Sequence, residues 1–432
     1  MIKKQYTGSA RRARNRRKTC SLPGGILVAC ARITHETRTA NAAMDNPSDF
    51  GLTELQLEIK NTCREIGEKK IVPVREKYDA EGIFPRDIAK EFADAGLFGL
   101  FIPEQYGGMG GNTMDMVVAV EELSKYCAGI ALSLFGTALG TLPILLCGSD
   151  AQKEKYLPRI AQGAIAAFAL TEANAGSDAA GVATTAVKDG DSYVLNGTKQ
   201  WITNGGEAEI YTICTTTDKS RGARGATFFV VEDGTPGFTY GKKENKMGIR
   251  ASATRELVLQ DVRVPKENVI WGEGRGFFVA MKTLDRSRPS VAAQALGIAE
   301  GALECAVKYS RERHQFGQPI NANQGYRFML ADMAMKVEAA KALVYRCARY
   351  MDSGAKDISK ISAMAKCYAS DVAMSVTTDA VQALGGYGYM KEYPVEKMMR
   401  DAKITQIYEG TNQIQRDVIG RELVKEAAAG LI

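Results

Sequence analysis

Three short segments of this sequence combine glycine with side chains that can donate hydrogen bonds or accept a proton. Residues 170–178 read LTEANAGSD directly after an apolar run, so main-chain amides there could approach a phosphate or the edge of a ring. Residues 199–206 read KQWITNGG and set one of only two tryptophans beside a hydroxyl. Residues 408–413 read YEGTNQ and leave a carboxylate where a glycine interrupts a helical pattern. Taken singly, such segments are also typical of turns and solvated surface.

The scarcity of histidine narrows the chemistry that these segments can serve. The 432 residues include only His35 and His314, too few for a Ser-His-Asp triad, a haem pocket or a histidine-bound zinc. Nine cysteines contain no CxxC pair, which predicts reduced thiols and no metal site. GxGxxG and GxxxxGK[ST] are both absent, and GEGRG at 272–276 is typical of a turn. Any dinucleotide must therefore bind through another architecture.

Positive charge is concentrated in residues 1–43. They hold ten Lys and Arg against one acid, a net charge of +9, which leaves −3 for residues 44–432 out of a total of +6. The arm has the composition of a mitochondrial transit peptide, of unstructured sequence ahead of Met44, or of a nucleic-acid-binding arm. Because almost no aromatic residue interleaves the basic ones, we expect a basic leader or disordered extension and no nucleic-acid partner. We expect a cytoplasmic protein, or a mitochondrial matrix protein if the arm is a transit peptide.

The hydrophobic pattern divides the rest of the chain into three parts. Helical periodicity covers residues 44–165, short β-rich segments fill 166–275, and helical periodicity returns over 276–432. This order predicts an α+β protein with an N-terminal α-helical domain, a middle antiparallel β-barrel domain and a C-terminal four-helix bundle. Asn196-Gly197 is predicted to turn a tight hairpin.

The uncharged stretch between Tyr126 and Ser149 is long enough to cross a membrane. Small residues and Pro143 interrupt it, so we interpret it as a buried core helix or the wall of a pocket. We therefore expect no membrane span.

Longer motifs accompany the three segments. RERHQFGQPI occupies residues 311–320, and QALGGYGYMKEYPVEKMMRDAKITQIYEGTNQIQR occupies residues 382–416. Together with ALTEANAGSD, KQWITNGG and the α–β–α order, they resemble the acyl-CoA dehydrogenase family, and within it the medium- and short-chain branch. The resemblance covers about residues 50–425, nearly all of the chain beyond the basic arm.

The resemblance implies FAD bound between the β domain, the bundle and a neighbouring subunit of a homotetramer, a dimer of dimers. The FAD contacts that it implies near the β domain are Phe168, Leu170, Thr171, Gly176, Ser177, Trp201, Ile202 and Thr203. The contacts that it implies to the FAD of the adjacent subunit are Arg313, His314, Gln315, Phe316, Gln324, Gln382, Leu384, Gly385 and Gly386. Thr411, Asn412 and Gln413 match a further flavin contact.

The same resemblance implies a mechanism. Glu409 matches the base that removes the α-proton of an acyl-CoA thioester while flavin N5 accepts hydride from the β-carbon, giving the trans-2-enoyl-CoA. Ser287 stands where the isovaleryl branch keeps its base and cannot serve as one. Ser177, Asp285, Arg288 and Gly410 match substrate contacts. The implied electron acceptor is electron-transferring flavoprotein, and the implied role is fatty acid or carboxylic acid degradation.

The acyl group itself stays open at this point. Phe135 stands where medium-chain enzymes carry a glutamate, and Ile130 replaces the arginine of glutaryl-CoA relatives, so decarboxylation is not expected. Short, medium, branched, alicyclic and aryl-substituted acyl groups all fit the motifs. The alternatives are an enoyl-CoA reductase, an acyl-CoA oxidase and, outside enzymes, a flavin-free scaffold.

Overall fold

The N-terminal part of the chain is helical and centres on one long, bent helix. The computed structural model describes residues 51–431, so the interpretations of residues 1–43 lie outside the described residues. The helices are α1 (Glu54–Ile66), which continues into the π-helix η3 (Gly67–Ile71), α2 (Arg75–Glu81), α3 (Arg86–Asp94), α4 (Thr113–Cys147) and α5 (Asp150–Ala161). The backbone of Cys127 leaves helical geometry, with φ −165° and ψ 109°, and divides α4 into two halves. The stretch that the sequence marks as a core helix or pocket wall is the second half.

The middle part is a β domain. Its strands are β1 (Ala166–Ala169), β2 (Thr185–Asp189), β3 (Ser192–Thr203), β4 (Ile210–Thr216), β5 (Ala226–Glu232), β6 (Phe238–Lys243), β7 (Thr254–Pro265) and β8 (Val269–Ile270). They pair in the order β6-β7-β3-β2-β4-β5-β8, with β1 on β4. Most neighbours are antiparallel as predicted, but β1 and β4 run parallel, as does the short contact of β2 with β4. The connection from β1 to β4 spans residues 170–209 and includes β2 and β3, which is long enough for a parallel return.

The prediction of a hairpin turn at Asn196-Gly197 is wrong. Both residues lie inside β3, and β2 and β3 are joined instead at Gly190-Asp191. The register of β3 against β7 shifts between Leu195 and Gly197, which marks a β-bulge. Gly197 has φ 148°, and a Cβ there would meet the Thr184 hydroxyl at 2.6 Å. Glycine is therefore needed here for close backbone approach rather than for a turn.

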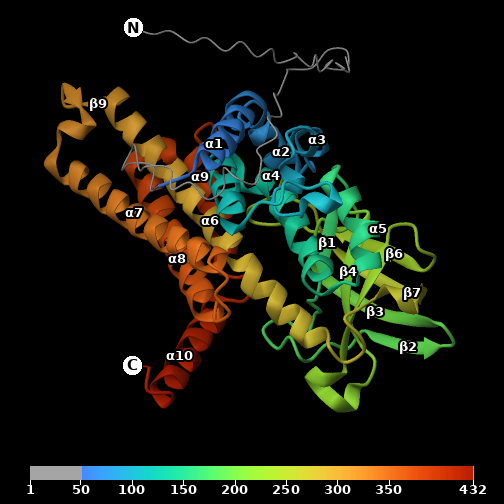
Figure 1. The fold of residues 1–432 in the computed structure, drawn as a ribbon. Coiled ribbons are helices and arrows are strands. Elements are labelled where there is room, and N and C mark those ends of the chain that lie inside the picture. The colour runs from blue at the N-terminus through green and yellow to red at the C-terminus, as the bar shows by residue number, and fades with distance from the viewer. Residues whose placement is uncertain (1–50, 432) are drawn as a thin grey trace, which may run out of the picture. The chain divides into compact units, whose positions relative to one another are not determined.

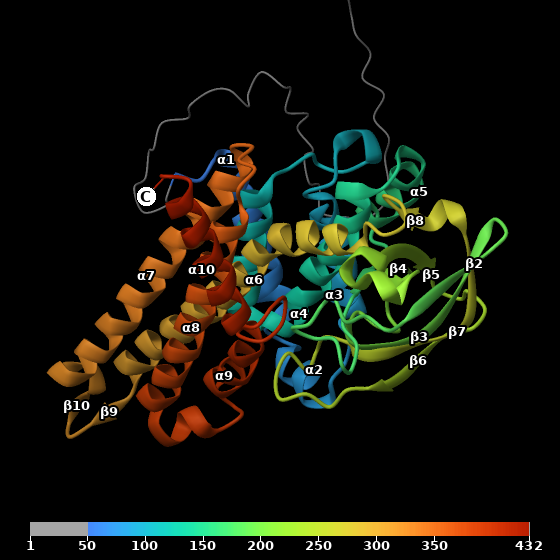
Figure 2. The same ribbon diagram turned by 90° about the horizontal axis from the view of Figure 1, so that it is seen from below.

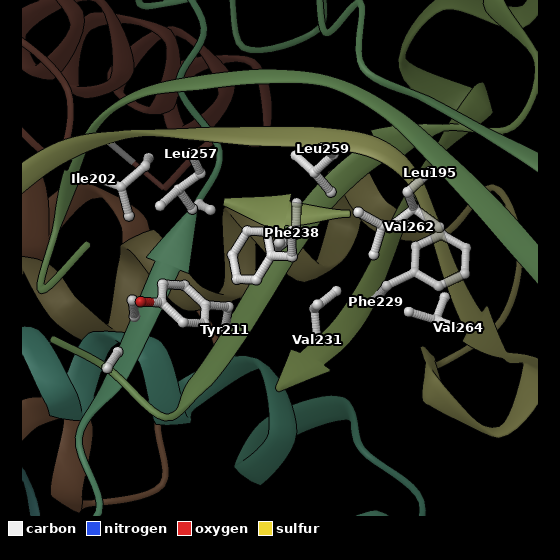
Figure 3. Close-up of a cluster of buried hydrophobic side chains, with 14 of the residues drawn as sticks. Leu195, Ile202, Tyr211, Phe229, Val231, Phe238, Leu257, Leu259, Val262 and Val264 are labelled. Atoms are coloured by element: carbon white, nitrogen blue, oxygen red, sulfur yellow. The ribbon is translucent and has the colours of Figure 1, made fainter. Parts of the chain in front are cut away.

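Alternating inward residues of these strands make the core of the β domain. Figure 3 shows Leu195, Leu257, Leu259, Phe229 and Phe238 gathered in one buried cluster. Leu259 and Phe238 are direct partners on the neighbouring strands β7 and β6. Tyr211 packs edge-on against Phe238 at a centroid separation of 4.9 Å. This packed interior holds β1 and β3 rigidly, which matters because both strands carry predicted site residues.

The C-terminal part is a helical bundle. Its elements are α6 (Gly276–Glu312), the short hairpin β9 (His314–Gln315) and β10 (Gln318–Pro319), α7 (Gln324–Asp352), α8 (Ser359–Leu384), α9 (Pro394–Thr405) and α10 (Asn412–Ala428). Residues 394–428 thus form two helices, α9 and α10. The chain leaves helical geometry between them, where Glu409 and Gly410 both have positive φ.

Two long helices join the parts. Figures 1 and 2 show the sheet on one side, α7, α8 and α10 on the other, and α4 and α6 between them. Both α4 and α6 are long and apolar enough to cross a membrane, but 78% and 72% of their apolar windows are buried inside the protein. Such burial is typical of core helices. The predicted order of helical, β and helical parts is confirmed, with β1 starting at Ala166 and α6 at Gly276.

Candidate active site

Glu409 lies in the non-helical turn between α9 and α10. Its φ is 53°, an uncommon backbone conformation for a residue other than glycine, and Gly410 follows with φ 91°. The Gln415 amide donates to the carbonyls of Glu409 (3.1 Å) and Gly410 (2.9 Å), and the Lys366 ammonium also donates to the Gly410 carbonyl (2.8 Å). Among the described residues the Glu409 N–H has no acceptor. Its two carbonyls are thus held by Gln415 and Lys366, while this main-chain donor is available to a ligand.

The Glu409 side chain is held against α6. The Ser287 hydroxyl hydrogen-bonds the Glu409 carboxylate. Although a neighbouring cavity leaves part of the residue accessible, protein atoms surround the carboxylate, and burial raises the pKa of Glu409 to about 7. The Ser287 bond and the positive charges of Lys366 and Arg288 oppose that rise. A carboxylate with a pKa near 7 is suited to general-base catalysis at neutral pH.

A cavity of about 380 Å³ opens beside this carboxylate. Its wall is largely apolar on the side of α4, with Phe135, Ala138, Leu139, Leu142, Leu145 and Leu146. Arg286, Ser287 and Ser290 of α6 line it together with Glu409, and Thr113, Met116 and Asp352 also contribute. Phe135 lies where the sequence places a change in the pocket, whereas Ile130 is not one of the lining residues. The arrangement suits an apolar chain ending in a polar group at Glu409.

The break in α4 is what encloses this cavity. Thr113 and Met116 belong to the first half of α4, while Leu142 and Leu145 come near the end of the second half. A straight helix would separate residues 113 and 145 by about 48 Å, since each residue adds about 1.5 Å. Because the chain turns at Cys127, both ends of the helix reach the same cavity.

A second group of predicted residues lies on β1, β3 and the segment between them. The Trp201 side chain is 56% exposed on a backbone with φ 57°, whereas Ile202 next to it is buried. Thr171 accepts a hydrogen bond from the Gln200 N–H (2.9 Å), which ties the 170–178 segment to the KQWITNGG segment. Thr203 also lies close to α4, because a Cβ on Gly136 would meet its methyl carbon at 2.9 Å.

A third group lies at the end of the bundle. It lines a cavity of about 660 Å³ that is open at the surface. The predicted residues that line it are Arg313, Gln315, Phe316, Gln382, Leu384, Gly385 and Gly386. Tyr309 and Tyr387 are among the other residues that line it, and the Arg313 guanidinium lies 5.4 Å from the centre of the Tyr387 ring. Both ribbon views place β9 and β10 at the end of the bundle away from the sheet, so this cavity is separate from the first (Figures 1 and 2).

Comparison with known proteins gives matches to the N-terminal, middle and C-terminal parts of the chain. Three family models match: "Acyl-CoA dehydrogenase, N-terminal domain" over residues 53–164, "middle domain" over 167–262 and "C-terminal domain" over 274–424. The short-chain specific acyl-CoA dehydrogenase of Megasphaera elsdenii is 52% identical, over 87% of this chain and all of that protein. The chain belongs to the acyl-CoA dehydrogenase family.

Other relatives show what this family branch includes. The solved butyryl-CoA dehydrogenase of Megasphaera elsdenii is 51% identical with a TM-score of 0.85, covering 86% of this chain and 99% of that one. A chain from a structure of the electron transferring flavoprotein of Acidaminococcus fermentans, concerned with flavin-based electron bifurcation, is 52% identical with a TM-score of 0.85, covering 87% and 99%. An acryloyl-CoA reductase (NADH) of Anaerotignum propionicum is 48% identical, covering 87% and 96%. This acyl-CoA dehydrogenase is thus a flavin-dependent oxidoreductase.

The remaining predicted site residues differ in burial and in whether their side chains already have hydrogen-bond partners. Arg288 is nearly buried and paired with Asp285 at 2.7 Å, and Asp285 also accepts from Ser359 (2.5 Å). Asn412 is buried, and its amide bonds Lys366, Ser370 and Asp371 inside the bundle. Any contact of Asn412 with a flavin would therefore use its main chain.

The other residues of that set are more accessible. Thr411 caps α10 through the Ile414 N–H (3.3 Å), and Gln413 is exposed. Gln324 begins α7 next to the second cavity but does not line it, and His314 is exposed in β9. Gly176 and Ser177 are exposed on the loop after β1.

The sequence did not predict the buried polar residues that fix the Glu409 turn and the 170–178 segment. Lys199 is fully buried and pairs with Glu172 at 2.6 Å, and Lys366 is fully buried beneath the Glu409 turn. Gln415 bonds both carbonyls of that turn. The only available signal was a lysine at an inward position of a predicted strand or helix, since lysine is almost never fully buried unless it is paired.

Proposed function

We propose that this acyl-CoA dehydrogenase is an FAD-dependent enzyme that oxidises short straight-chain acyl-CoA thioesters to trans-2-enoyl-CoA. One observation carries the proposal. Glu409, which lines a largely apolar cavity, carries both a carboxylate with a pKa of about 7 and a main-chain N–H that has no acceptor among residues 51–431. α,β-Dehydrogenation needs a base at the α-carbon and a donor at the thioester oxygen, and this turn supplies both.

The chain's own residues perform the proton half of the reaction. The Glu409 carboxylate removes the α-proton, and the Glu409 N–H donates to the thioester carbonyl oxygen, where negative charge develops. A preorganised donor of this kind is worth about 2.7–4 kcal/mol of transition-state stabilisation. Gly410, with φ 91° and no side chain, leaves room for the thioester to approach the main chain. Deprotonated Glu409 is the active form, so the acid limb of the rate profile reports its pKa.

The two remaining residue groups fit a flavin dinucleotide. When bound, FAD accepts the β-hydride. Trp201 presents an exposed aromatic face, and Gly176 has open space where a Cβ would stand, so the β1–β3 group offers a flat surface with accessible main chain. The cavity at Arg313 offers a guanidinium, amide side chains and open glycines suited to an adenosine diphosphate. We propose that these groups hold two different FAD molecules.

That separation supports a homo-oligomer. Because the Arg313 cavity lies far from Glu409, its dinucleotide must extend from another copy of the chain. Phe316 at the rim of this cavity is 98% exposed, and Phe328 and Met335 on α7 are also exposed. Apolar side chains left this open mark an interface. We propose the homotetramer, a dimer of dimers.

Charge supports coenzyme A as the carrier of the acyl group. Exposed cations gather where α6 begins: Lys219, Arg221, Arg224, Arg275 and Lys282. The Lys282 ammonium lies 4.6 Å from the centre of the exposed Trp271 ring. One turn further along α6, Arg286 lines the cavity beside Glu409. Phosphates and an adenine would find both charge and a stacking surface here, with Ser177, Asp285 and Arg288 contacting the rest of the coenzyme.

The acyl group and the electron acceptor are argued from the relatives. Two of those reported are a short-chain specific enzyme and a butyryl-CoA dehydrogenase, and the bulky Phe135 lies in the cavity wall. An electron-transferring flavoprotein is the proposed acceptor, supported by the relative from the Acidaminococcus structure. A cytoplasmic location is also proposed, supported by seven free cysteines among the described residues.

The decisive test is Glu409→Gln. It keeps the size of the side chain and a hydrogen-bonding oxygen but removes the base, so flavin and butyryl-CoA should still bind. Anaerobic bleaching of the flavin by butyryl-CoA should slow by at least about 10²–10⁴-fold. Adding Ser287→Glu puts a carboxylate on α6, within reach of the same α-carbon, and partial recovery would support the geometry. Bleaching of Glu409→Gln at the wild-type rate would show that another residue is the base.

The reverse reaction is a second candidate, because one reported relative is an acryloyl-CoA reductase (NADH). The site chemistry is the same in both directions, with protonated Glu409 as the acid. Enoyl-CoA reduction faster than acyl-CoA oxidation, with physiological donors and acceptors, would favour it.

A further inference from the structure

Lys366 of α8 is a buried charge that the proposed mechanism does not use. Its side chain is fully buried, and its ammonium donates to the Gly410 carbonyl (2.8 Å) and to the Asn412 side-chain oxygen (3.0 Å). Both acceptors are neutral. Among the described residues no carboxylate lies within ion-pair distance of Lys366. A buried ammonium with only neutral partners is costly unless a counter-charge lies nearby.

The charges around Lys366 identify that counter-charge. Arg288 on α6 is paired with Asp285 at 2.7 Å, and Asp371 on α8 is paired with Arg416 on α10 at 2.6 Å. These two ion pairs are internally balanced. Within the part of the chain that the structure describes, Glu409 has a hydroxyl, that of Ser287, as its direct partner and no cation within ion-pair distance. Of these charged groups in residues 51–431, Lys366 and Glu409 are therefore the two without an ion-pair partner, and the carbonyl that Lys366 holds belongs to the residue after Glu409.

We propose that Lys366 is a positioning residue for the base, whose buried ammonium both fixes the Gly410 carbonyl and supplies the positive charge against which Glu409 ionises. The inference rests on the proposed role of Glu409. Holding the Gly410 carbonyl toward α8 maintains the left-handed turn at Glu409 and Gly410, which leaves the Glu409 N–H free. The same contact places a cation next to the turn that carries the carboxylate, while the direct partner of the carboxylate stays the Ser287 hydroxyl.

Electrostatics agree with this geometry. Burial lowers the pKa of Lys366 to about 8, and the negative charge of Glu409 is the largest influence opposing that fall. In return, the Lys366 charge opposes the burial that raises the pKa of Glu409. Near pH 7 Lys366 is therefore mostly protonated. Removing its charge should raise the pKa of Glu409, since an opposite charge nearby typically shifts a carboxyl by about 1–3 units.

The experiment compares the pH dependence of flavin bleaching in four proteins. Wild type, Lys366→Met, Lys366→Arg and Lys336→Met are mixed anaerobically with butyryl-CoA from about pH 5.5 to pH 9, and kcat/KM for flavin reduction is followed. Lys336 is the matched control because it is a half-exposed lysine of α7 that contacts Ser375 and Asp379, away from the base. Its loss changes net charge by the same amount.

We expect the midpoint of the acid limb to move up by about one unit or more in Lys366→Met. Lys366→Arg should keep the wild-type midpoint, as should Lys336→Met. The rate of Lys366→Met should approach its plateau again above the new midpoint. A rate that falls equally at every pH, with the midpoint unmoved, would mean that Lys366 only supports the fold, and the proposal would be wrong.

A second variant covers the case in which Lys366→Met does not fold. Lys366→Gln retains an amide donor for the Gly410 carbonyl and the Asn412 side-chain oxygen but removes the charge that acts on Glu409. The midpoint should again rise, and an unmoved midpoint would overturn the proposal. Glu409→Gln separates this inference from the function itself. If Glu409→Gln still bleaches, the assignment of the base fails, whereas a dead Glu409→Gln beside an unshifted Lys366→Met refutes only the role of Lys366.

Discussion

The buried ion pair between Glu172 and Lys199 makes a strong prediction about flavin binding. Glu172 lies on the segment after β1 and accepts hydrogen bonds from the Ala183 N–H (2.7 Å), the Thr184 N–H (3.0 Å) and the Lys199 ammonium (2.6 Å). Lys199 is fully buried and also donates to the Leu170 carbonyl (3.1 Å). One carboxylate thus ties both ends of the 170–184 loop to β3, which carries Trp201.

The perturbation is Glu172→Gln, which keeps the shape of the side chain and leaves Lys199 buried without a counter-charge. Breaking a buried pair on one side costs about 3–5 kcal/mol, whereas replacing both partners with apolar groups is often neutral. Burial acts to raise the pKa of Glu172, but the Lys199 charge and the Thr184 and Ala183 bonds outweigh it, so the pKa lies below its usual range. Glu172 is therefore ionised at neutral pH, and its contribution to stability is lost as the pH falls through that lowered value.

The assay is flavin retention and thermal unfolding of four proteins. Glu172→Gln should release flavin on gel filtration and unfold well below wild type, while Glu172→Leu with Lys199→Met should recover at least about 2 kcal/mol, within the range of couplings between contacting residues. Arg263→Met is the control, since its partner Asp189 and Arg263 itself are both more than half exposed and should contribute less than about 1 kcal/mol. A stable Glu172→Gln that keeps its flavin would refute the reasoning.

Three further outcomes are expected. Flavin reduction in the wild type should rise with pH through a midpoint near 7, because burial raises the pKa of Glu409 to about 7 and only the ionised form acts; a pH-independent rate from pH 6 to 8 would contradict this. Phe135→Ala should raise the kcat/KM ratio of hexanoyl-CoA to butyryl-CoA roughly tenfold, at about 0.8 kcal/mol per added methylene, and an unchanged ratio would remove Phe135 from the acyl site. A protein starting at Met44 should keep flavin and assembly, because residues 1–43 carry +9 of charge but no periodic apolar face; loss of either on gel filtration would show a structural role.

The predictable features of this protein are those whose local structure is set by residues nearby in the sequence. The change from helical to alternating periodicity and back located the three parts, and the glycine after Glu409 marked a real break between α9 and α10. Asn196-Gly197 shows where local reasoning fails. The pair favours a tight turn, but the approach of Thr184, the residue before β2, and pairing with β7 placed it in a β-bulge. Tertiary contacts overrode the local preference.

The buried lysines that contact the site segments were not predictable, for a related reason. Lys199 and Lys366 each lie in an otherwise ordinary strand or helix, and nothing nearby in the sequence names their partners. Glu172 is 27 residues from Lys199, and Gly410 is 44 residues from Lys366. A motif search finds the groups that touch substrate and cofactor because those groups cluster in the sequence. The buried charges that set the geometry and the ionisation of those groups become visible only when the fold shows which charge lacks a partner of its own.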